Sequence, residues 1–363
     1  MTYVSEDSQL KAIRKKIDAI DEKIQALISE RASYAKQVAK TKQEAGSTDF
    51  YRPEREAEVL RQVLARNEGP VTDDEMTRLF REIMSVCLAL ESPLIVAYLG
   101  PEGTFTQQAA LKHFGHSVNT LALNAIDEVF REVESGNAHF GVVPVENSTE
   151  GVVSHTLDTF MRSDLKICGE VQLRVHQHLL SQHSGLEKIK KIVSHQQSLA
   201  QCREWLDTNL PNIERVAVSS NAEAARVAAS EKNVAAIAGE SAATIYALNT
   251  LASNIEDEPD NTTRFFIVGL VETESTGNDK TSLLLSGKNK PGALHDLLGI
   301  LARHGINMTR IESRPSRQAA WEYVFFLDLQ GHANDDCVSK ALTELKSDAA
   351  LFKLLGSYPV SVR

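Results

Sequence analysis

The chain has 363 residues, of which 42% are hydrophobic and 24% charged, an ordinary composition for a soluble globular protein. This length predicts two or three domains rather than one small core. A net charge of −10 and the lack of a dense Lys/Arg tract argue against nucleic acid as a partner, and no apolar run reaches the roughly 18 residues of a membrane span. The N-terminus lacks the apolar core of a signal peptide, and four scattered cysteines indicate neither disulfides nor a zinc site. We therefore expect a cytoplasmic protein that binds no metal.

The first quarter of the chain shows helical periodicity. Apolar residues at alternating three- and four-residue spacing run from Leu10 to Val38, and Gly46 ends the run. This predicts one helix of about 35–40 residues, roughly 55 Å long, followed by two shorter helices near 53–66 and 73–91. Such a long helix cannot bury its apolar seam against two short helices alone. We expect an intertwined helical homodimer, with a higher oligomer left open.

The rest of the chain has a different pattern. Residues 94–271 contain short β-like runs separated by helical stretches, which predicts a two-lobed α/β fold; the runs are LIVAYLG, FGVVPV, IKKIVS, VAAIAG and TRFFIVG. The polar stretch VETESTGNDK predicts a linker. Residues 278–363 follow the order strand, helix, strand, strand, helix, strand, which is typical of ferredoxin-like α+β domains. With residues 1–92, these ranges predict three domains.

Three cations interrupt the apolar seam of the long helix. Arg14, Arg31 and Lys42 occupy positions with core spacing, where a charge is costly unless it is paired or binds a ligand. They could pair with acids such as Glu56 or extend into water, but three on one helix, followed by Arg55, favour a buried anion site. Arg14 and Arg31 are 17 residues apart, about 25 Å along a helix. Arg14 would therefore serve the site of a partner subunit.

The helix over 73–91 ends on an acid, in the sequence SVCLALE. Glu91 follows Cys87 by one turn and stands at a helix C-terminus, which is the less favourable end for a carboxylate. Either Glu91 is the first solvated residue of a linker, or it points into a site that needs an acid.

Polar clusters follow several strands of the α/β region. Ligands of open α/β sheets gather at the carboxyl ends of strands, so we expect the first three clusters to converge. The loop GPEGTF lacks a Walker lysine, and nucleotide binding is therefore not supported. The clusters are Gly100–Phe105; Glu146, Asn147 and Ser148; Ser194–Gln197; and Thr263 with Arg264.

The helical region resembles the all-helical chorismate mutases over essentially its whole length, in LKAIRKKIDAIDEKIQALISERASYAKQVAKTK, YRPEREAEVL and RLFREIMSVCLALE. The resemblance implies a pericyclic rearrangement of chorismate to prephenate, which needs no nucleophile or cofactor because the site holds a compact conformer and stabilises charge on the ether oxygen. It implies that Arg14, Arg31, Lys42 and Arg55 bind the two carboxylates and the ether oxygen region of chorismate. It also implies that Glu56 accepts a hydrogen bond from the substrate hydroxyl. The implied site residues are Arg14, Arg31, Lys42, Arg55, Glu56, Cys87 and Glu91.

This chain has Glu91 where some relatives have Gln, and Cys87 where some relatives have Ser or Ala. A glutamine donates a hydrogen bond to the ether oxygen, whereas an ionised Glu91 only accepts and would repel the developing charge. Glu91 must therefore be protonated to assist. Burial and the helix dipole raise the pKa of such a carboxyl group, and Lys42 opposes them.

The polar motifs of residues 94–271 together resemble the prephenate dehydratases. The resemblance implies that prephenate loses carbon dioxide and its ring hydroxyl to give phenylpyruvate, with Thr263 donating to that hydroxyl. Glu146 is the stronger intrinsic acid if burial raises its pKa, and the choice between the two stays open. Asn147, Ser148 and Gln197 would orient the substrate, and Arg264 would hold a carboxylate.

The C-terminal region resembles the ACT regulatory domains, in the form found in phenylalanine-sensitive dehydratases, through KNKPGALHDLLGILARHGINMTRIESRP. The implied ligand is L-phenylalanine, bound between paired domains and favouring a less active state. The implied contacts are Gly292, Ala293, Leu294, Glu312, Ser313 and Arg314.

These resemblances favour a bifunctional enzyme of phenylalanine biosynthesis, a chorismate mutase (an isomerase) and prephenate dehydratase (a carbon–oxygen lyase) inhibited by phenylalanine. One alternative is a non-catalytic amino-acid sensor, against which Glu146 and Thr263 argue. A second is a dimerising coiled coil without mutase activity, but a plain coiled coil would prefer apolar residues where Arg31 and Lys42 stand.

Overall fold

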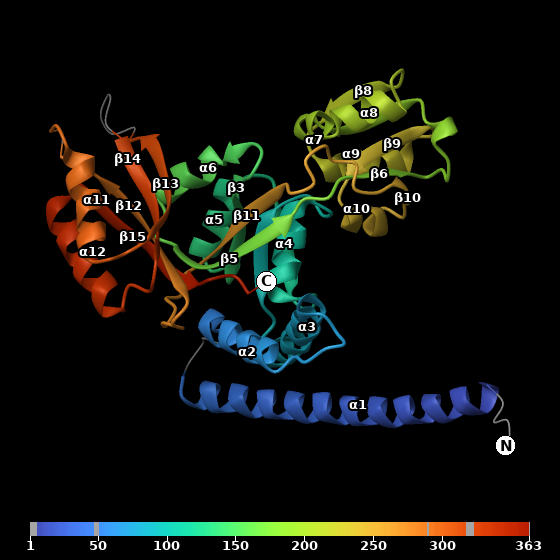
Figure 1. Ribbon diagram of the computed structural model, residues 1–363, viewed down its shortest axis with the longest axis horizontal. Coiled ribbons are helices and arrows are strands. Elements are labelled where there is room, and N and C mark those ends of the chain that lie inside the picture. The colour runs from blue at the N-terminus through green and yellow to red at the C-terminus, as the bar shows by residue number, and fades with distance from the viewer. Residues whose placement is uncertain (1–5, 47–50, 289, 317–322, 363) are drawn as a thin grey trace.

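The structure, a computed structural model, describes residues 6–46, 51–288, 290–316 and 323–362. Three regions follow one another along the chain: three helices, a two-lobed α/β region and a C-terminal four-stranded sheet with two helices (Figure 1). This confirms the fold class expected for each region. Within the described ranges, no helix is long and apolar enough to cross a membrane.

The helical region contains the three predicted helices. The first, α1 (Glu6–Glu44), has 39 residues, and α2 (Pro53–Ala65) and α3 (Asp73–Glu91) follow. Thr72 and Glu75 form a capping box that satisfies backbone amides at the start of α3. The lengths and limits of these helices confirm the prediction to within a few residues.

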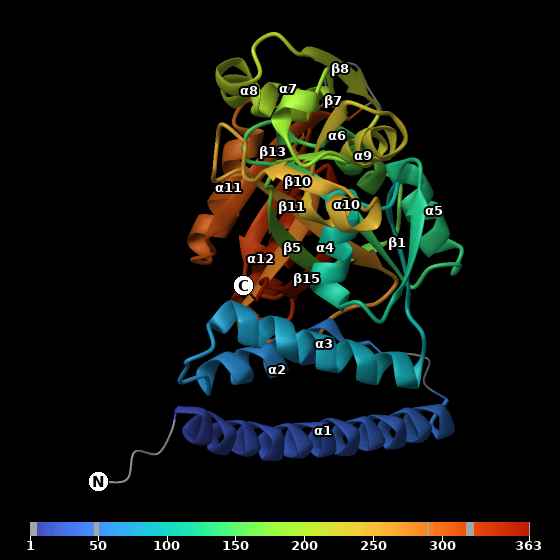
Figure 2. The ribbon, with the colours of Figure 1, turned by 90° about the vertical axis from the view of Figure 1, so that its right-hand side faces the viewer.

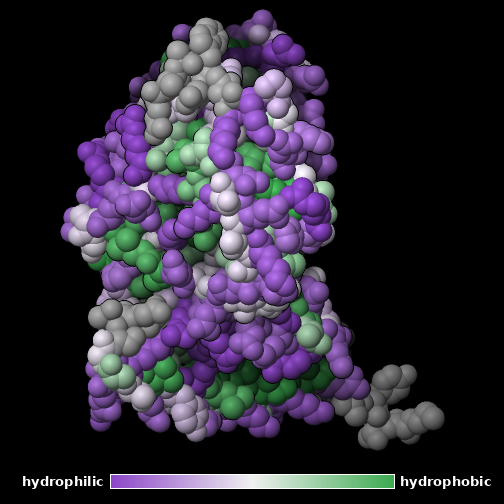
Figure 3. Space-filling view, turned by 90° about the vertical axis from the view of Figure 1, so that its left-hand side faces the viewer, coloured by the Kyte–Doolittle hydropathy of each residue, from purple (hydrophilic) through white to green (hydrophobic). Residues whose placement is uncertain are grey.

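The apolar seam of α1 is exposed in the single chain. The helix runs as a long rod beneath α2 and α3 (Figures 1 and 2), and apolar side chains form a band over this base of the molecule (Figure 3). The seam residues are between 46 and 63% exposed, and they are Leu10, Ile13, Ile17, Ile20, Ile24, Leu27, Tyr34 and Val38. An exposed apolar stripe of this length is typical of a helix that packs against another subunit.

The first lobe of the α/β region is a mixed sheet with strand order β2-β1-β3-β11-β5, and β4 pairs with β3. Helix α4 covers one face, and α5 and α6 cover the other. The strands are β1 (Ile95–Leu99), β2 (Asn119–Leu123), β3 (Phe140–Asn147), β4 (Gly151–Val152), β5 (Lys166–Arg174) and β11 (Thr262–Gly269), and the helices are α4 (Phe105–Phe114), α5 (Ile126–Glu134) and α6 (Ser154–Phe160).

The second lobe is inserted between β5 and β11, and its strand order is β10-β6-β9-β7-β8. The chain crosses between the lobes twice, and Val175 N donates to Asn261 O where the two crossings meet. The strands are β6 (His178–Ser181), β7 (Lys191–His195), β8 (Glu214–Val218), β9 (Val234–Ala238) and β10 (Asn249–Ala252). The helices are the 3-10 helix η1 (Leu186–Lys188), α7 (Gln196–Gln201), α8 (Arg203–Asn209), α9 (Asn221–Ser230) and α10 (Glu240–Ile245).

The C-terminal region has the predicted order of strands and helices, and its sheet order is β13-β14-β12-β15. Residues 321 and 322, predicted to begin its third strand, lie outside the described residues. The elements are β12 (Asp279–Ser286), α11 (Ala293–Arg303), β13 (Met308–Pro315), β14 (Tyr323–Gln330), α12 (Asp336–Asp348) and β15 (Leu351–Pro359).

The stretch before β12, predicted as a linker, has no helix or strand as far as residue 278, but it is packed. Thr273 and Asp279 are buried. Arg61 of α2 donates to Thr276 Oγ1 at 2.7 Å and to Asn278 O at 2.8 Å. The prediction of a polar connector is therefore right about secondary structure and wrong about its last two residues, which already belong to β12.

The first lobe packs against both neighbouring regions. Phe266 of β11 meets Tyr358 of β15, with ring centroids 5.8 Å apart, so the C-terminal sheet lies on the first lobe while α11 and α12 cover its other face. On the opposite side of the lobe, Tyr51 from the helical region packs between Phe114 and Phe140, with centroids 5.2 Å from each. The three regions thus share buried contacts.

Candidate active sites

A cavity of about 440 Å³ lies among the three N-terminal helices. Its volume suits a small organic molecule. Six of the seven mutase residues expected from the sequence line it: Arg31 and Lys42 from α1, Arg55 and Glu56 from α2, and Cys87 and Glu91 from α3. Arg14 does not line this cavity and lies on the exposed N-terminal half of α1. The three helices therefore gather cations and carboxyl groups around one space.

Glu91 is directed into this cavity at the end of α3. Burial raises the pKa of Glu91, and the positive charges of Lys42 and Arg31 oppose this shift. The carboxyl group therefore lies where two cations of α1 act on it. Glu91 therefore borders the cavity, and its role as an acid in that site stays a prediction.

Glu56 has buried partners that the sequence analysis did not find. Its carboxylate lies 3.5 Å from Arg81 Nε, and the two side chains are 15 and 13% exposed. Burial raises the pKa of Glu56, whereas Arg81 and the Tyr51 hydroxyl lower it. The only sequence signal for Arg81 is its helical spacing from Thr77 and Ser85, which share the buried face of α3.

A polar cluster on the first lobe joins two of the predicted dehydratase residues. Asn147 Nδ2 donates to Thr263 Oγ1 at 2.8 Å and to Asn261 Oδ1 at 2.7 Å. Ser148 pairs with the backbone of Thr262 through its own backbone amide and its Oγ. The cluster lies where the chain crosses between the lobes, so a relative movement of the lobes would act on it directly. Asn261 was not predicted from the sequence.

Glu146 and Arg264 lie on the other face of the same two strands. They are paired in the register of β3 and β11, as are Asn147 and Thr263, and successive residues of a strand point to opposite faces. Glu146 accepts a hydrogen bond from Arg310 Nε of β13 at 2.9 Å. The two expected acids, Glu146 and Thr263, therefore face different sides of the sheet.

Arg264 is bound to carboxylates of the protein. Its Nε donates to Glu170 at 2.8 Å, its Nη1 contacts Asp328 of β14 at 2.5 Å, and its Nη2 contacts Tyr358 at 3.1 Å. Lys280 also binds Glu170, whose side chain is fully buried. The expectation that Arg264 holds a substrate carboxylate is not reflected in these contacts, because its donors bind Glu170 of β5 and Asp328 and Tyr358 of the C-terminal sheet.

Gln197 lies on the second lobe, at the start of α7. In the part of the chain that the structure describes, no hydrogen bond joins Gln197 to Asn147 or Thr263. The loop after β1 does reach the second lobe, since Tyr246 Oη donates to Glu102 O at 3.1 Å. Two of the three clusters expected to converge are thus on the first lobe, and the third is on the second lobe.

The C-terminal region has its own cavity, of about 410 Å³. Gly292, Ala293 and Leu294 line it, together with Tyr323 and Phe325 of β14. Gly292 has a φ of +78°, a conformation that glycine adopts without strain, and it stands immediately before α11. The backbone amides at the start of a helix favour an anionic group such as a carboxylate.

The second expected regulatory motif lies outside this cavity. Glu312 and Ser313 belong to β13, and Arg314 donates to Ser154 Oγ at 2.8 Å and to Asp158 at 3.2 Å, both on α6. Arg314 therefore ties the C-terminal sheet to the first lobe. Among the described residues, no group of three or more His, Cys, Asp or Glu side chains could hold a metal ion.

Three protein families match successive parts of the chain. Chorismate mutase type II matches residues 13–92, prephenate dehydratase matches residues 96–273, and the ACT domain matches residues 281–346. Each match covers one of the three structural regions described above. Together they define a multidomain enzyme that combines a mutase, a dehydratase and a regulatory domain.

Whole-chain relatives have the same combination. A bifunctional chorismate mutase/prephenate dehydratase of Stutzerimonas stutzeri is 58% identical over 99% of this chain and 100% of the relative. One from Pseudomonas aeruginosa is 56% identical over the same shares. The solved prephenate dehydratase of Arthrobacter aurescens, in complex with L-Phe, is 35% identical with a TM-score of 0.68, covering 73% of this chain and 90% of that one.

The chain belongs to the family of bifunctional chorismate mutase/prephenate dehydratases. It rearranges chorismate to prephenate and converts prephenate to phenylpyruvate, two reactions of phenylalanine biosynthesis. The two activities and the regulatory domain expected from the sequence are confirmed.

Proposed function

We propose that the rearrangement of chorismate takes place in the 440 Å³ cavity of the helical region. The observation that carries this proposal is the set of cations from α1 and α2 that line one cavity together with Glu91. Arg31 and Arg55 are placed to bind the two carboxylates of a dianion, and Arg pairs with carboxylates in a bidentate geometry. Holding chorismate in a compact conformer brings the atoms that form the new carbon–carbon bond together.

The ether bond that breaks needs donors for its oxygen. We assign this role to Lys42 and to protonated Glu91, which lie together at the C-terminal end of α3. Glu56 accepts a hydrogen bond from the substrate hydroxyl, which requires its ionised form, and both Arg81 and Tyr51 favour that form. Cys87 also lines this cavity.

The helical region is proposed to function as a homodimer. The seam of α1 remains exposed in one chain, and Arg14 lies on the same helix too far from the cavity of its own chain to line it. A second α1 packed along the seam would bury these apolar side chains and bring Arg14 of each chain to the cavity of the other. Whether dimers associate further stays open.

For the dehydratase reaction we propose Thr263 as the donor to the departing hydroxyl. Decarboxylation leaves an electron pair that enters the ring, the carbon–oxygen bond breaks, and a proton converts the leaving hydroxide to water. Asn147 uses its amide hydrogens on Asn261 and on Thr263 Oγ1. The Thr263 hydroxyl accepts from Asn147, so its own proton is available to the substrate. Glu146 faces the opposite side of the sheet.

Substrate orientation is assigned to Asn147, Ser148 and, from the second lobe, Gln197. The proposed role of Arg264 changes, because its contacts with Glu170 and Asp328 suit a residue that positions β11. Thr263 directly precedes Arg264 on that strand, and Arg264 would fix the backbone of Thr263.

We further propose that the cavity beside Gly292 binds L-phenylalanine. The Arthrobacter aurescens relative was solved in complex with L-Phe, and the cavity here combines helix-start amides for a carboxylate with Tyr323 and Phe325 for an aromatic ring. Feedback inhibition requires that phenylalanine bind the less active state more tightly. Glu312, Ser313 and Arg314 would couple the bound state to the first lobe.

One assay tests the separation of the sites. Chorismate is added to the purified full chain, and prephenate and phenylpyruvate are followed with time. Arg31→Ala should abolish formation of both products from chorismate while leaving turnover of added prephenate, and titration of the full chain with phenylalanine should release or absorb heat. Loss of prephenate turnover in Arg31→Ala, or no heat with phenylalanine, would contradict the corresponding assignment. A cytoplasmic location stays a prediction.

A further inference from the structure

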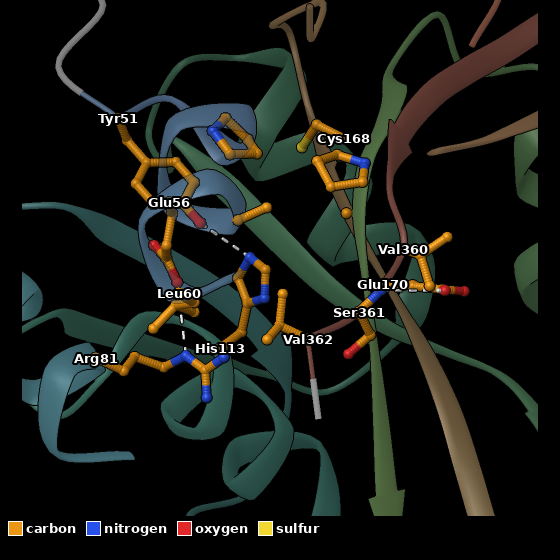
Figure 4. Close-up of a pocket in the computed structure, with 14 residues that line it drawn as sticks. Tyr51, Glu56, Leu60, Arg81, His113, Cys168, Glu170, Val360, Ser361 and Val362 are labelled. Atoms are coloured by element: carbon orange, nitrogen blue, oxygen red, sulfur yellow. Dashed lines mark hydrogen bonds and ion pairs between the residues drawn. The ribbon is translucent and has the colours of Figure 1, made fainter. Parts of the chain in front are cut away.

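The wall of the mutase cavity includes one residue from outside the helical region. Phe114, the last residue of α4, lines the cavity beside Glu56. The adjacent His113 reaches Tyr51 of the helical region, and its Nε2 lies 3.0 Å from Tyr51 Oη (Figure 4). Tyr51 is only 5% exposed, and its ring is packed among aromatic rings of the first lobe. The position of the Tyr51 side chain is therefore fixed by the dehydratase part of the chain.

Tyr51 and Glu56 line one small cavity with His113, and the Tyr51 hydroxyl lowers the pKa of Glu56. An ionised carboxylate only accepts hydrogen bonds, so Tyr51 favours the ionised form of Glu56 when its hydroxyl proton is directed at that carboxylate. In that arrangement the oxygen of Tyr51 accepts from His113 Nε2, 3.0 Å away. Burial lowers the pKa of His113 to about 3, so its ring is neutral at physiological pH and carries one proton, which this contact places on Nε2.

The space around these side chains is small. Glu56, Tyr51 and His113 line a cavity of about 40 Å³, which has no room for a substrate, and residues 359–362 line it as well (Figure 4). In such a water-poor place a hydrogen bond to a carboxylate is stronger than in solvent. The charged and titratable groups around Glu56 are Arg81, Tyr51, His113, Cys168 and Glu170 at the junction, and Arg31, Tyr34, Lys42, Arg52, Arg55, Cys87 and Glu91 across the mutase cavity.

We propose that Tyr51 and His113 are positioning residues for the mutase reaction: His113 of the dehydratase region orients the Tyr51 hydroxyl, which holds Glu56 ionised and directed at the substrate. Arg81 supplies the balancing charge from α3. The mutase site of this chain is thus completed by α4, an element of the dehydratase fold. This inference rests on the proposed role of Glu56 as the acceptor for the substrate hydroxyl.

The test uses the full chain and two substitutions that keep the aromatic packing, Tyr51→Phe and His113→Phe. Each should lower mutase kcat/KM by about 5- to 10-fold, the effect of losing one hydrogen bond to a charged group. Each should also move the acid limb of the mutase pH profile to higher pH, because the hydroxyl that lowers the pKa of Glu56 is lost or misdirected. The double variant should be no worse than the more impaired single variant, since both act through one hydrogen bond chain.

Two further variants make the result specific. His113→Gln keeps a donor near Nε2 and should recover most of the lost mutase activity. His116→Gln is a matched control, because His116 also joins the two regions, through Glu82 at 2.6 Å, but is exposed and lies away from Glu56. It should leave the mutase profile unchanged. Turnover of added prephenate should be equal in all these variants.

The outcomes distinguish the inferred roles of Tyr51 and His113 from the proposed role of Glu56. If Glu56→Ala leaves mutase turnover intact, the proposed role of Glu56 fails and this inference fails with it. If Glu56→Ala loses mutase turnover while Tyr51→Phe and His113→Phe keep the wild-type kcat/KM and acid limb, only the inference is overturned. Equal losses of mutase and dehydratase turnover would likewise overturn it, because they indicate a general disturbance of the fold.

Discussion

Arg310 of the C-terminal sheet donates through Nε to the carboxylate of Glu146, on the strand that also carries Asn147, at 2.9 Å. The Arg310 side chain is 10% exposed. A residue of the regulatory region is therefore in direct contact with the strand that supports the dehydratase cluster. Any change in the position of β13 acts on β3 through this pair.

Arg310→Met should weaken feedback inhibition. Inhibition depends on contacts that differ between an active and an inhibited state, and this substitution removes one such candidate contact while keeping an unbranched apolar stem. We expect the phenylalanine concentration for half-maximal inhibition to rise several-fold, with mutase turnover unchanged. The control is Arg303→Met, which removes an ion pair with Glu344 within the C-terminal region. Equal inhibition of both variants and the wild type would exclude a coupling role for Arg310.

Glu91→Gln should flatten the pH profile of the mutase. Burial raises the pKa of Glu91, and the donor form is the protonated one, so mutase kcat/KM should rise as the pH falls towards that pKa and decline above it. A glutamine donates at every pH. The measurement is kcat/KM for chorismate over a pH series, with turnover of prephenate as the internal control. An unchanged pH profile in Glu91→Gln would indicate that Glu91 is only a solvated residue at a helix end.

Thr263→Val should abolish most dehydratase turnover and spare the mutase. Valine keeps the shape of threonine but lacks the hydroxyl that lies beside Asn147, and loss of one donor at a reacting oxygen lowers kcat by about 100-fold or more. The matched control is Thr262→Val, because the Thr262 hydroxyl donates to Asp260 O and not to the cluster around Asn147. Comparable turnover of prephenate by wild type and Thr263→Val would rule out Thr263 as the donor.

Arg264→Met should destabilise the protein strongly. The substitution leaves Glu170 and Asp328 buried with fewer partners, and breaking a buried ion pair from one side costs about 3–5 kcal/mol. The free energy of unfolding is measured by urea denaturation. Arg174→Met removes an exposed pair with Asp260 and should have little effect. A similar small effect in both variants would show that the buried cluster is not important for stability.

Mixing two inactive variants should restore mutase activity. In a dimer that shares cations, a chain with Arg14→Ala and a chain with Arg31→Ala together form one intact site. After the two are unfolded and refolded together, half of the dimers are mixed and each has one working cavity, so roughly one quarter of wild-type turnover should return. Each variant refolded alone is the control. No recovery in the mixture would place Arg14 outside the partner's cavity.

The elements that repeat a clear period were predictable from the sequence. The apolar spacing over α1 gave a helix of nearly the observed 39 residues, and five apolar runs gave β1, β3, β7, β9 and β11. Strand β5 was missed because Gly169 and the buried charge of Glu170 interrupt it. Nothing local marks Glu170 as buried, since its partners Arg264 and Lys280 are 94 and 110 residues away.

The residues of the candidate sites were likewise predictable only where the local sequence is unusual. Arg31, Lys42 and Glu91 stood out because a charge on an apolar helix face is conspicuous, and the structure places all three around one cavity. Tyr51 and His113 carry no such signal, because an aromatic residue in a loop and a histidine on a helix are ordinary. Their pairing depends on how two regions pack, as does the division of Glu146 and Thr263 between two faces of a sheet.

The exposed seam of α1 has a consequence for the balance of the two activities. If the mutase cavity needs Arg14 from a second chain, its activity follows the law of mass action and declines when the protein is diluted below the dissociation constant of the dimer. The Asn147–Thr263 cluster lies within one chain and would not respond in this way. Dilute enzyme would then consume prephenate faster than it makes it, and the ratio of the two rates would report the concentration of assembled protein.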